Sequence, residues 1–266
     1  MKQEKKQTMS NAKIAVVFFA FLTFIVVISL IVKVINVIRT SKFDNFKRFT
    51  LSVANGKNIQ IMSLSSNPGS VAVFKLNGNI KPMDAGRLLE IPIDGFIEFK
   101  SQDLNQKIDS LFINAILNYH NLKTNLTIID LLRLAFCTRT IPESLINVET
   151  VDDTRGLEID KIVGRLAIDA NVEKDGQTIQ IVNATFVSGL GNRLAKLITN
   201  MGGNVILVMT EDNSRKKSVI TYIDKKTYTV ERLQQVLGYE VVREPNNAMS
   251  DITIIIGEDK LNVAPF

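Results

Sequence analysis

The chain has 266 residues, of which 45% are hydrophobic and 22% charged, so one or two packed domains are expected and wholesale disorder is excluded. Its single cysteine, Cys137, and single histidine, His120, exclude an intramolecular disulfide framework and a zinc site built only from these two residue types. The net charge of +5 comes from the first 50 residues, which hold nine Lys or Arg against two Asp or Glu. The rest of the chain is slightly acidic, so no basic face for nucleic acid is expected.

A long apolar segment lies close to the start of the chain. Residues 14–32 are uncharged throughout, and only Thr23 and Ser29 interrupt their hydrophobicity. As a helix this segment would span about 28 Å, close to the hydrocarbon thickness of a bilayer. A cleaved signal peptide is disfavoured, because the apolar run is too long and no A-x-A cleavage site follows. The sequence therefore predicts an uncleaved transmembrane helix and the start of a stalk over residues 14–38, preceded by a tail at 1–13.

Basic residues flank this segment on both sides. Four lysines precede residue 14, and five Lys or Arg lie between residues 33 and 48. This balance does not decide the orientation by the positive-inside rule. Basic flanks suit anionic lipid head groups, so the lipid bilayer is the partner expected for residues 14–38.

Residues 49–172 are predicted to form a first α/β domain. Short β-type runs come first, separated by the turn signals Asn55-Gly56 and SSNPGS. Helical periodicity follows, and Thr127 with Asp130 three residues later forms a capping box for the second helix. The expected strands are 49–54, 58–64, 70–76 and 95–100, and the expected helices begin near residues 108, 127 and 140.

Residues 173–266 are predicted to form a second α/β domain in the order β-α-β-β-α-β, with its helices on one face of a sheet. The first helix carries an apolar stripe and ends at Gly202-Gly203. Thr229 is the expected N-cap of the second helix, and Gly238 follows its end. The run NVILVMT at 204–210 indicates a buried strand. The expected strands are 178–184, 204–210, 218–224 and 251–257.

The loop after the strand at 178–184 holds the candidate ligand-binding residues. Gly189-x-Gly191 opens the next helix and could cradle a phosphate at the helix N-terminus, although the third glycine of a dinucleotide fingerprint is missing. Asn183 and Thr185 could line a shallow groove for a glycan or a peptide. A flexible loop with local side-chain capping is the alternative for both pairs. The candidate ligand-binding residues are Asn183, Thr185, Gly189, Gly191 and Arg193.

No catalytic residue, metal site or cofactor is predicted from the residues themselves. Acidic residues near the boundary of the two domains offer oxygen ligands for a divalent cation, but a solvated loop explains them better. They are Asp152, Asp153, Glu158 and Asp160. Cys137 is expected in the core, and His120 at the surface near a helix end.

The second predicted domain has a recognisable order of features. A strand ends at Asn183, a glycine-containing loop follows, and then come the helix NRLAKLITNMGGNV, the strand SVITYI and the final strand SDITIIIGED. This order, over about residues 175–260, resembles the C-terminal domain of LytR/CpsA/Psr-type cell-envelope proteins. The features occur at the spacing expected for that domain.

The first predicted domain resembles, more faintly, the catalytic domain that precedes this module in the same family. That resemblance implies transfer of glycopolymers from polyprenyl-pyrophosphate carriers to peptidoglycan, with arginines, aspartates and a divalent metal around the pyrophosphate. The family's Ser-Ile-Pro-Arg-Asp-type stretch has no counterpart here, because SLSSNPGS and KLNGNIKP hold neither arginine nor aspartate.

Guanidinium groups bind a pyrophosphate bidentately, so their loss removes most of the electrostatic stabilisation of the transferring group. A degenerate, inactive relative of the catalytic domain is therefore predicted. Convergence of Arg87, Arg133 and Arg139 on one cleft beside clustered carboxylates would contradict that prediction.

The resemblance implies a single-pass protein of the bacterial cell membrane, with a cytoplasmic N-terminus and extracytoplasmic domains. The leading hypothesis is a noncatalytic cell-envelope protein that binds peptidoglycan, another wall polymer or an envelope protein through its C-terminal domain. A glycopolymer transferase acting on a polyprenyl-pyrophosphate-linked substrate is the first alternative. A transcription regulator facing the cytoplasm is the second, and the missing basic face argues against it, so no nucleic acid is expected as a partner.

Overall fold

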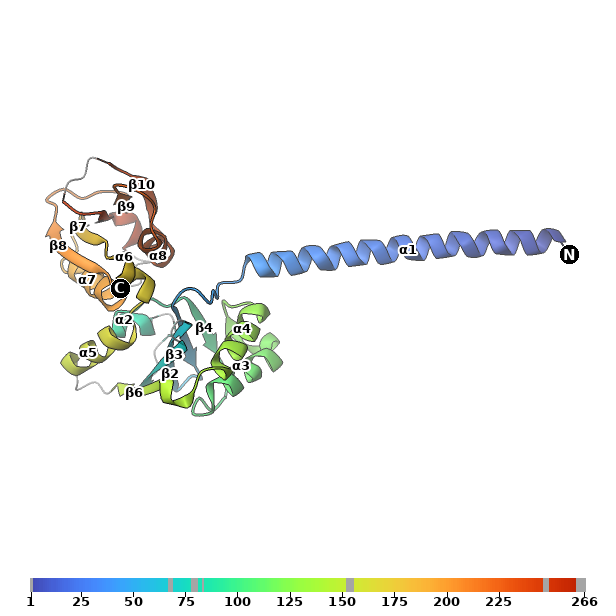
Figure 1. Cartoon of the computed structure of the whole chain (residues 1–266), viewed down its shortest axis with the longest axis horizontal. Coiled ribbons are helices and arrows are strands. Elements are labelled where there is room, and N and C mark those ends of the chain that lie inside the picture. Colours follow the sequence, from blue (N-terminus) through green and yellow to red (C-terminus); the bar gives the residue numbers. More distant parts are fainter. Residues whose placement is uncertain are drawn as a thin grey trace. The chain divides into compact units, whose positions relative to one another are not determined.

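The computed structural model describes residues 2–66, 69–77, 81–82, 84–151, 156–245 and 249–261. The chain divides into two compact units, Met1–Ser41 and Lys42–Phe266 (Figure 1). The smaller unit is one helix. The larger unit holds two β-sheets with their helices, so the predicted fold class, an N-terminal apolar helix followed by two α/β domains, is confirmed.

Helix α1 (Lys2–Arg39) contains the apolar segment. Its part from Ile14 to Arg39 is long and apolar enough to cross a membrane, and every described side chain before Lys33 in that part is exposed. The hydroxyl of Thr23 donates a hydrogen bond to the carbonyl oxygen of Phe19, so the helix itself satisfies this polar group. Such internal pairing is what a helix surrounded by lipid requires.

The first sheet of the larger unit has six strands in the order β5-β4-β1-β2-β3-β6. The central strands β1 to β3 form an antiparallel meander, while β4 joins β1 and β6 joins β3 in parallel. The strands are β1 (Phe49–Ala54), β2 (Asn58–Ser66), β3 (Gly69–Asn77), β4 (Gly95–Glu98), β5 (Lys123–Thr124) and β6 (Ile146–Val151).

Both faces of this sheet are covered (Figure 1). The helices here are α2 (Ala85–Leu89), α3 (Ile108–Leu117), α4 (Ile128–Arg139) and α5 (Gly156–Leu166). Leu51 and other residues of one face pack against α3 and α4 through Leu111 and Leu131. Phe74 on the opposite face belongs to a second cluster with Leu89 of α2. Alternate residues of each central strand therefore enter different cores, as the two-residue period of a strand requires.

The second sheet has the order β10-β9-β11-β7-β8. Its elements, after helix α6 (Ala170–Asp175), are β7 (Thr178–Asn183), α7 (Leu190–Asn200), β8 (Asn204–Thr210), β9 (Val219–Tyr222), α8 (Tyr228–Leu237), β10 (Glu240–Arg243) and β11 (Ile252–Ile256). The predicted order of elements is confirmed, with the short strand β10 added. Ile181 and Ile254 pack with Leu194 of α7 and Leu233 of α8 on one face of the sheet.

Several local predictions are confirmed. The hydroxyl oxygen of Thr127 accepts a hydrogen bond from the backbone N–H of Asp130, and the Asp130 carboxylate accepts one from the backbone N–H of Thr127, which is a capping box. Gly202 and Gly238, which follow α7 and α8, have φ values of +93° and +65°. Only glycine adopts such values without steric cost. Asn67 and Pro68 of the predicted turn SSNPGS lie outside the described residues.

Two local predictions are wrong. Residue 140 does not start a helix: Thr140 ends α4, and Glu143–Leu145 forms one 3-10 turn before β6. Apolar and polar residues alternate at the start of β6, and this strand pairs with β3. These two features outweigh the helix-start signal at Thr140. The N-cap of α8 is Thr227, not Thr229. The backbone N–H and the hydroxyl of Thr229 both donate to the Asp175 carboxylate. A carboxylate from α6 therefore accepts one of the backbone N–H groups that the first turn of α8 leaves without a partner inside the helix.

A buried ion pair joins the two sheet regions. The Arg232 guanidinium on α8 donates hydrogen bonds of 2.6 and 2.9 Å to the two carboxylate oxygens of Asp94, which immediately precedes β4. Both side chains are almost fully buried, at 3% and 4% exposed. Asp94 also accepts a hydrogen bond from the backbone N–H of Thr50 in β1. Burial alone lowers the pKa of Arg232, but the charge and hydrogen bonds of Asp94 raise it above its ordinary value.

Arg48 makes a second link beside this pair. Its guanidinium donates to the hydroxyl of Ser63 in β2 at 2.7 Å and to the carbonyl oxygen of Ile168 at 2.6 Å. Burial lowers the pKa of Arg48 to about 10, so the group stays charged at neutral pH. The hydroxyl of Tyr228 donates to Asp169, and burial together with this bond raises the pKa of Tyr228.

We predict that Arg232→Leu lowers the stability of the larger unit by about 3–5 kcal/mol, because it leaves the Asp94 carboxylate buried without its cation. The measurement is the midpoint of thermal unfolding of the detergent-solubilised chain. Arg215→Leu is the matched control, since Arg215 pairs with Glu211 in a half-exposed position and costs about 0–1 kcal/mol. Equal losses for the two variants would contradict the role of the buried pair.

Candidate functional site

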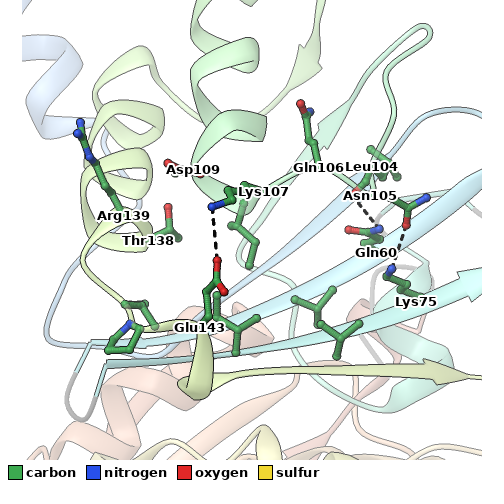
Figure 2. Close-up of a pocket in the computed structure, with 16 residues that line it drawn as sticks. Gln60, Lys75, Leu104, Asn105, Gln106, Lys107, Asp109, Thr138, Arg139 and Glu143 are labelled. Carbon is green, nitrogen blue, oxygen red and sulfur yellow. Dashed lines mark hydrogen bonds and ion pairs between the residues drawn. The ribbon is translucent and has the colours of Figure 1, made fainter.

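The first domain contains a cavity of about 650 Å³ between its sheet and the α3–α4 pair (Figure 2). Its walls come from the N-terminal end of α3, the C-terminal end of α4 and the strands β2, β3 and β6. The lining residues are Gln60, Val73, Lys75, Leu104, Asn105, Gln106, Lys107, Ile108, Asp109, Thr138, Arg139, Ile141, Pro142, Glu143, Ile146 and Val148.

The polar groups of this cavity bind mainly to one another. The Lys107 ammonium lies 3.4 Å from the Glu143 carboxylate, and the Lys75 ammonium donates to the side-chain oxygen of Asn105 at 2.9 Å (Figure 2). The Gln60 amide donates to the backbone carbonyl of Leu104. The Lys107–Glu143 pair is exposed on both sides, so it contributes little to stability and leaves Lys107 accessible to an anion.

Apolar side chains complete the cavity beneath this polar rim. They are Val73, Leu104, Ile108, Ile141, Ile146 and Val148. A concave apolar floor with a few polar groups around it is the usual form of a small-molecule site. This combination fits an amphipathic ligand better than a fully polar one.

Arg87, Arg133 and Arg139, whose convergence would indicate a pyrophosphate site, do not meet in this cavity. Arg139 lines it, whereas Arg87 on α2 pairs with the nearby Asp84 and belongs to the opposite face of the sheet. Arg133 on α4 reaches the backbone carbonyl of Phe43. The carboxylates in the cavity wall are Asp109 and Glu143. Several guanidinium groups would be needed to hold a pyrophosphate bidentately, and among the described residues that line this cavity Arg139 provides one.

Among the described residues, no group of three or more His, Cys, Asp or Glu side chains is placed to hold a metal ion. Asp152 and Asp153 and the side chains of Glu158 and Asp160, considered above as oxygen ligands, lie outside the described residues. His120 is exposed in a 3-10 turn, and Cys137 is half-buried against the core.

In the second domain, the candidate loop is held by its own polar side chains. The Asn183 amide donates to the carbonyl oxygen of Val187, and the Thr185 hydroxyl donates to the side-chain oxygen of Asn183. The Thr185 hydroxyl also accepts from the backbone N–H of Val187. Asn183 and Thr185 are buried, so in this conformation they shape the loop and do not face solvent.

Gly189 and Gly191 are both favoured over other residues, but for different physical reasons. Gly189 caps α7 with a φ of +83°, which favours glycine. A Cβ at Gly191 would lie 2.9 Å from a methyl carbon of Val208, so close packing of α7 on β8 requires a glycine there. Arg193, one turn into α7, is exposed. The five candidate residues thus lie in one loop and the first turn after it.

An apolar surface that was not predicted from the sequence lies at this loop and the neighbouring strand β8. Phe186 is 81% exposed and Val187 is also exposed. Strand β8, predicted as buried, is an edge strand whose exposed apolar residues are Ile206, Leu207 and Met209. An apolar run can form a strand buried on both sides or an edge strand, and its sequence does not distinguish the two. We call these five residues the β8 edge surface.

A family model agrees with the resemblance of the second domain seen in the sequence. Residues 177–259 match the model of the family described as LytR cell envelope-related transcriptional attenuator. The crystal structure of the transcriptional regulator yvhJ from Bacillus subtilis aligns with 46% of this chain and 98% of that chain, at 11% identity and a TM-score of 0.36. No curated protein matches the chain. The predicted LytR C-terminal domain is therefore confirmed, and together with the candidate membrane helix it indicates a membrane-anchored cell-envelope protein.

We predict that Thr185→Val destabilises the second domain by about 1–3 kcal/mol, because it leaves the Asn183 oxygen and the Val187 N–H without partners. Thr210→Val, at an exposed strand position, is the matched control and should change stability by less than about 0.5 kcal/mol. Thermal unfolding of the two variants measures the difference. Similar midpoints would show that the loop does not depend on this hydroxyl.

Proposed function

We propose that this chain, whose residues 177–259 form a LytR C-terminal domain, is a single-pass, noncatalytic cell-envelope protein with a cytoplasmic N-terminus and extracytoplasmic domains. Residues 49–172 are a degenerate relative of the catalytic domain that precedes this module in LytR/CpsA/Psr-type proteins. The C-terminal domain, residues 173–266, binds the partner. Residues 14–38 anchor the chain in the bilayer.

The dispersal of the arginines carries the noncatalytic part of this proposal. Arg87, Arg133 and Arg139 lie on different faces or at different ends of the first domain, and only Arg139 lines its cavity. Phosphoryl-group transfer depends on positive charge placed in advance around the transferring group. In this cavity Lys107 pairs with Glu143 and Lys75 donates to Asn105, so Arg139 is the guanidinium that could bind a phosphate bidentately, and one such group does not supply that charge.

The β8 edge surface supports a polypeptide as the partner of the C-terminal domain. One side of β8 pairs with β7 and the other side pairs with no described strand. An extended segment of another protein can pair with such an edge through its backbone, while apolar side chains supply specificity. Phe186, Leu207 and Met209 offer that apolar contact. Asn183 and Thr185 fix the loop that carries Phe186, and the other candidate residues, Gly189, Gly191 and Arg193, follow at the start of α7.

A wall polymer is the other class of partner that the sequence predicts for the C-terminal domain. Glycan sites commonly use exposed aromatic rings and polar side chains. Phe186 is an exposed ring, but Tyr239 of the same domain is buried. The apolar edge therefore favours a polypeptide over a glycan.

The test is photo-crosslinking of the full chain in intact cells, with a photoreactive residue at position 186. We predict a crosslinked protein adduct that disappears when Leu207→Lys is added, because a buried lysine at the edge is costly. A probe at Glu231, exposed on α8, is the matched control and should give no such adduct. An adduct unaffected by Leu207→Lys would contradict binding at β8. Saturable retention on purified wall material in place of an adduct would favour the polymer.

The cavity of the first domain favours one alternative function, the transfer of a glycopolymer from a polyprenyl-pyrophosphate carrier. Lys107 and Arg139 stand at the rim of an apolar floor, an arrangement suited to a lipid with an anionic head group. This alternative requires turnover of the lipid-linked substrate, and binding alone does not support it.

We predict no turnover of a polyprenyl-pyrophosphate-linked glycan by the full chain in detergent, with or without added Mg²⁺. The rate of turnover should equal that of the Lys107→Ala, Arg139→Ala double variant. Removing these two side chains from a noncatalytic cavity has no catalytic rate to lower. Release of the carrier pyrophosphate above the rate of the double variant would overturn the noncatalytic proposal.

A further inference from the structure

The exposed side chains of α3 and α4 have an unusual composition for helices that face water. On α3 they are Ile113 and Leu117; on α4 they are Ile128, Leu132, Arg133, Phe136 and Arg139. None of them is acidic, and five of the seven are apolar. Phe136 and Leu117 are 75% and 70% exposed. We call these seven residues the hairpin surface.

Other helices of the same unit show the ordinary pattern. The exposed residues of α7 are Asn192, Arg193 and Thr199, and those of α8 are Glu231 and Gln235. All five are polar. The apolar residues of α4 recur every four positions, at Ile128, Leu132 and Phe136, which places them in one stripe along the helix. The hairpin surface is therefore a second apolar stripe beside the one that enters the core.

The chain leaving the membrane helix is fastened to this hairpin. The backbone N–H groups of Lys42 and Phe43 both donate to one carboxylate oxygen of Asp130, at 2.9 Å each. The Phe43 ring is buried and packs edge-to-face on Phe49 of β1, with ring centroids 5.2 Å apart. Asp130 is itself fully buried in the first turn of α4.

Two residues, Thr40 and Ser41, lie between the last residue of α1 and Lys42. The three Cα–Cα steps from Arg39 to Lys42 reach at most about 11 Å. This limit follows from the covalent chain alone. Asp130 of α4 binds Lys42 itself, so this covalent limit applies to the first turn of α4 as well.

We propose that the hairpin surface docks on the bilayer in which the chain is anchored, with Leu117, Leu132 and Phe136 in the region between head groups and acyl chains. Arg133 and Arg139 meet anionic head groups there. Apolar residues flanked by arginines, with no acidic residue among the seven, are the composition of helices that lie in a membrane interface. A second copy of the chain fits less well, because a two-fold contact through this surface brings arginines together.

The chain has no tryptophan, so a single introduced tryptophan reports on one position. The experiment uses the full chain in vesicles of phosphatidylcholine and phosphatidylglycerol, with or without bromine on the acyl chains as a contact quencher. Phe136→Trp should lose about half of its emission with brominated lipid, because interfacial side chains reach about 5–10 Å into the membrane. Phe186→Trp, similarly exposed on the second domain, is the matched control and should keep its emission.

Equal emission of the two tryptophans in brominated vesicles would overturn the proposal. Leu132→Trp repeats the test at a second position of the stripe, and circular dichroism of each variant checks that the chain is folded. Emission of Phe136→Trp that moves to shorter wavelength with rising protein density, but is insensitive to bromine, would identify contact between copies and also overturn it.

The charges provide a second arm. Arg133→Gln with Arg139→Gln should reduce the quenching of Phe136→Trp in vesicles that contain phosphatidylglycerol, and should leave it unchanged in vesicles of phosphatidylcholine alone. No effect of the two substitutions in anionic vesicles would contradict the role of the arginines in docking.

Discussion

The carboxylate of Asp130 holds in place the first residues of the larger unit, which follow the membrane helix along the chain. One of its oxygens accepts the backbone N–H groups of Lys42 and Phe43, and the other accepts the backbone N–H and hydroxyl of Thr127. A single buried side chain thus caps α4 and fixes the residues that follow the span. Because only Thr40 and Ser41 separate α1 from Lys42, covalent geometry and one satisfied buried charge limit how far α4 can lie from the end of the apolar helix.

Much of the fold follows from local sequence signals. Turn residues, the capping box at Thr127 and the glycines after α7 and α8 each act within a few residues, and the structure shows them as expected. The Arg232–Asp94 pair joins residues 138 positions apart, and a local sequence pattern cannot predict a contact over that separation. The contact of Thr229 with Asp175 cannot be predicted from local sequence either, because Asp175 lies in another helix. Thr229 was expected to be the N-cap of α8, but it donates to this carboxylate from within the helix.

As a ligand site, the loop at Asn183 and Thr185 stays a prediction. The loop at Asn183 and Thr185 was found from its residue types, but those types serve loop formation and binding alike, and the structure shows the loop-forming hydrogen bonds. The sequence predicts the apolar run of β8 as buried, and it gives no sign that the apolar stripe of α4 is exposed. Hydrophobicity identifies residues that avoid water, but the final topology decides whether the domain itself or an external partner covers them.

The two exposed apolar surfaces lie on different domains and suit different surroundings. The β8 edge surface offers unpaired strand backbone, which a polypeptide can use and lipid cannot. The hairpin surface consists of helices whose backbone groups are paired internally, so lipid can cover it without leaving polar groups unsatisfied. Arg139 belongs both to this surface and to the cavity wall. A hairpin lying on the bilayer would place the rim of that apolar-floored cavity beside lipid head groups. A noncatalytic first domain, as proposed above, would in this way keep an approach to lipid.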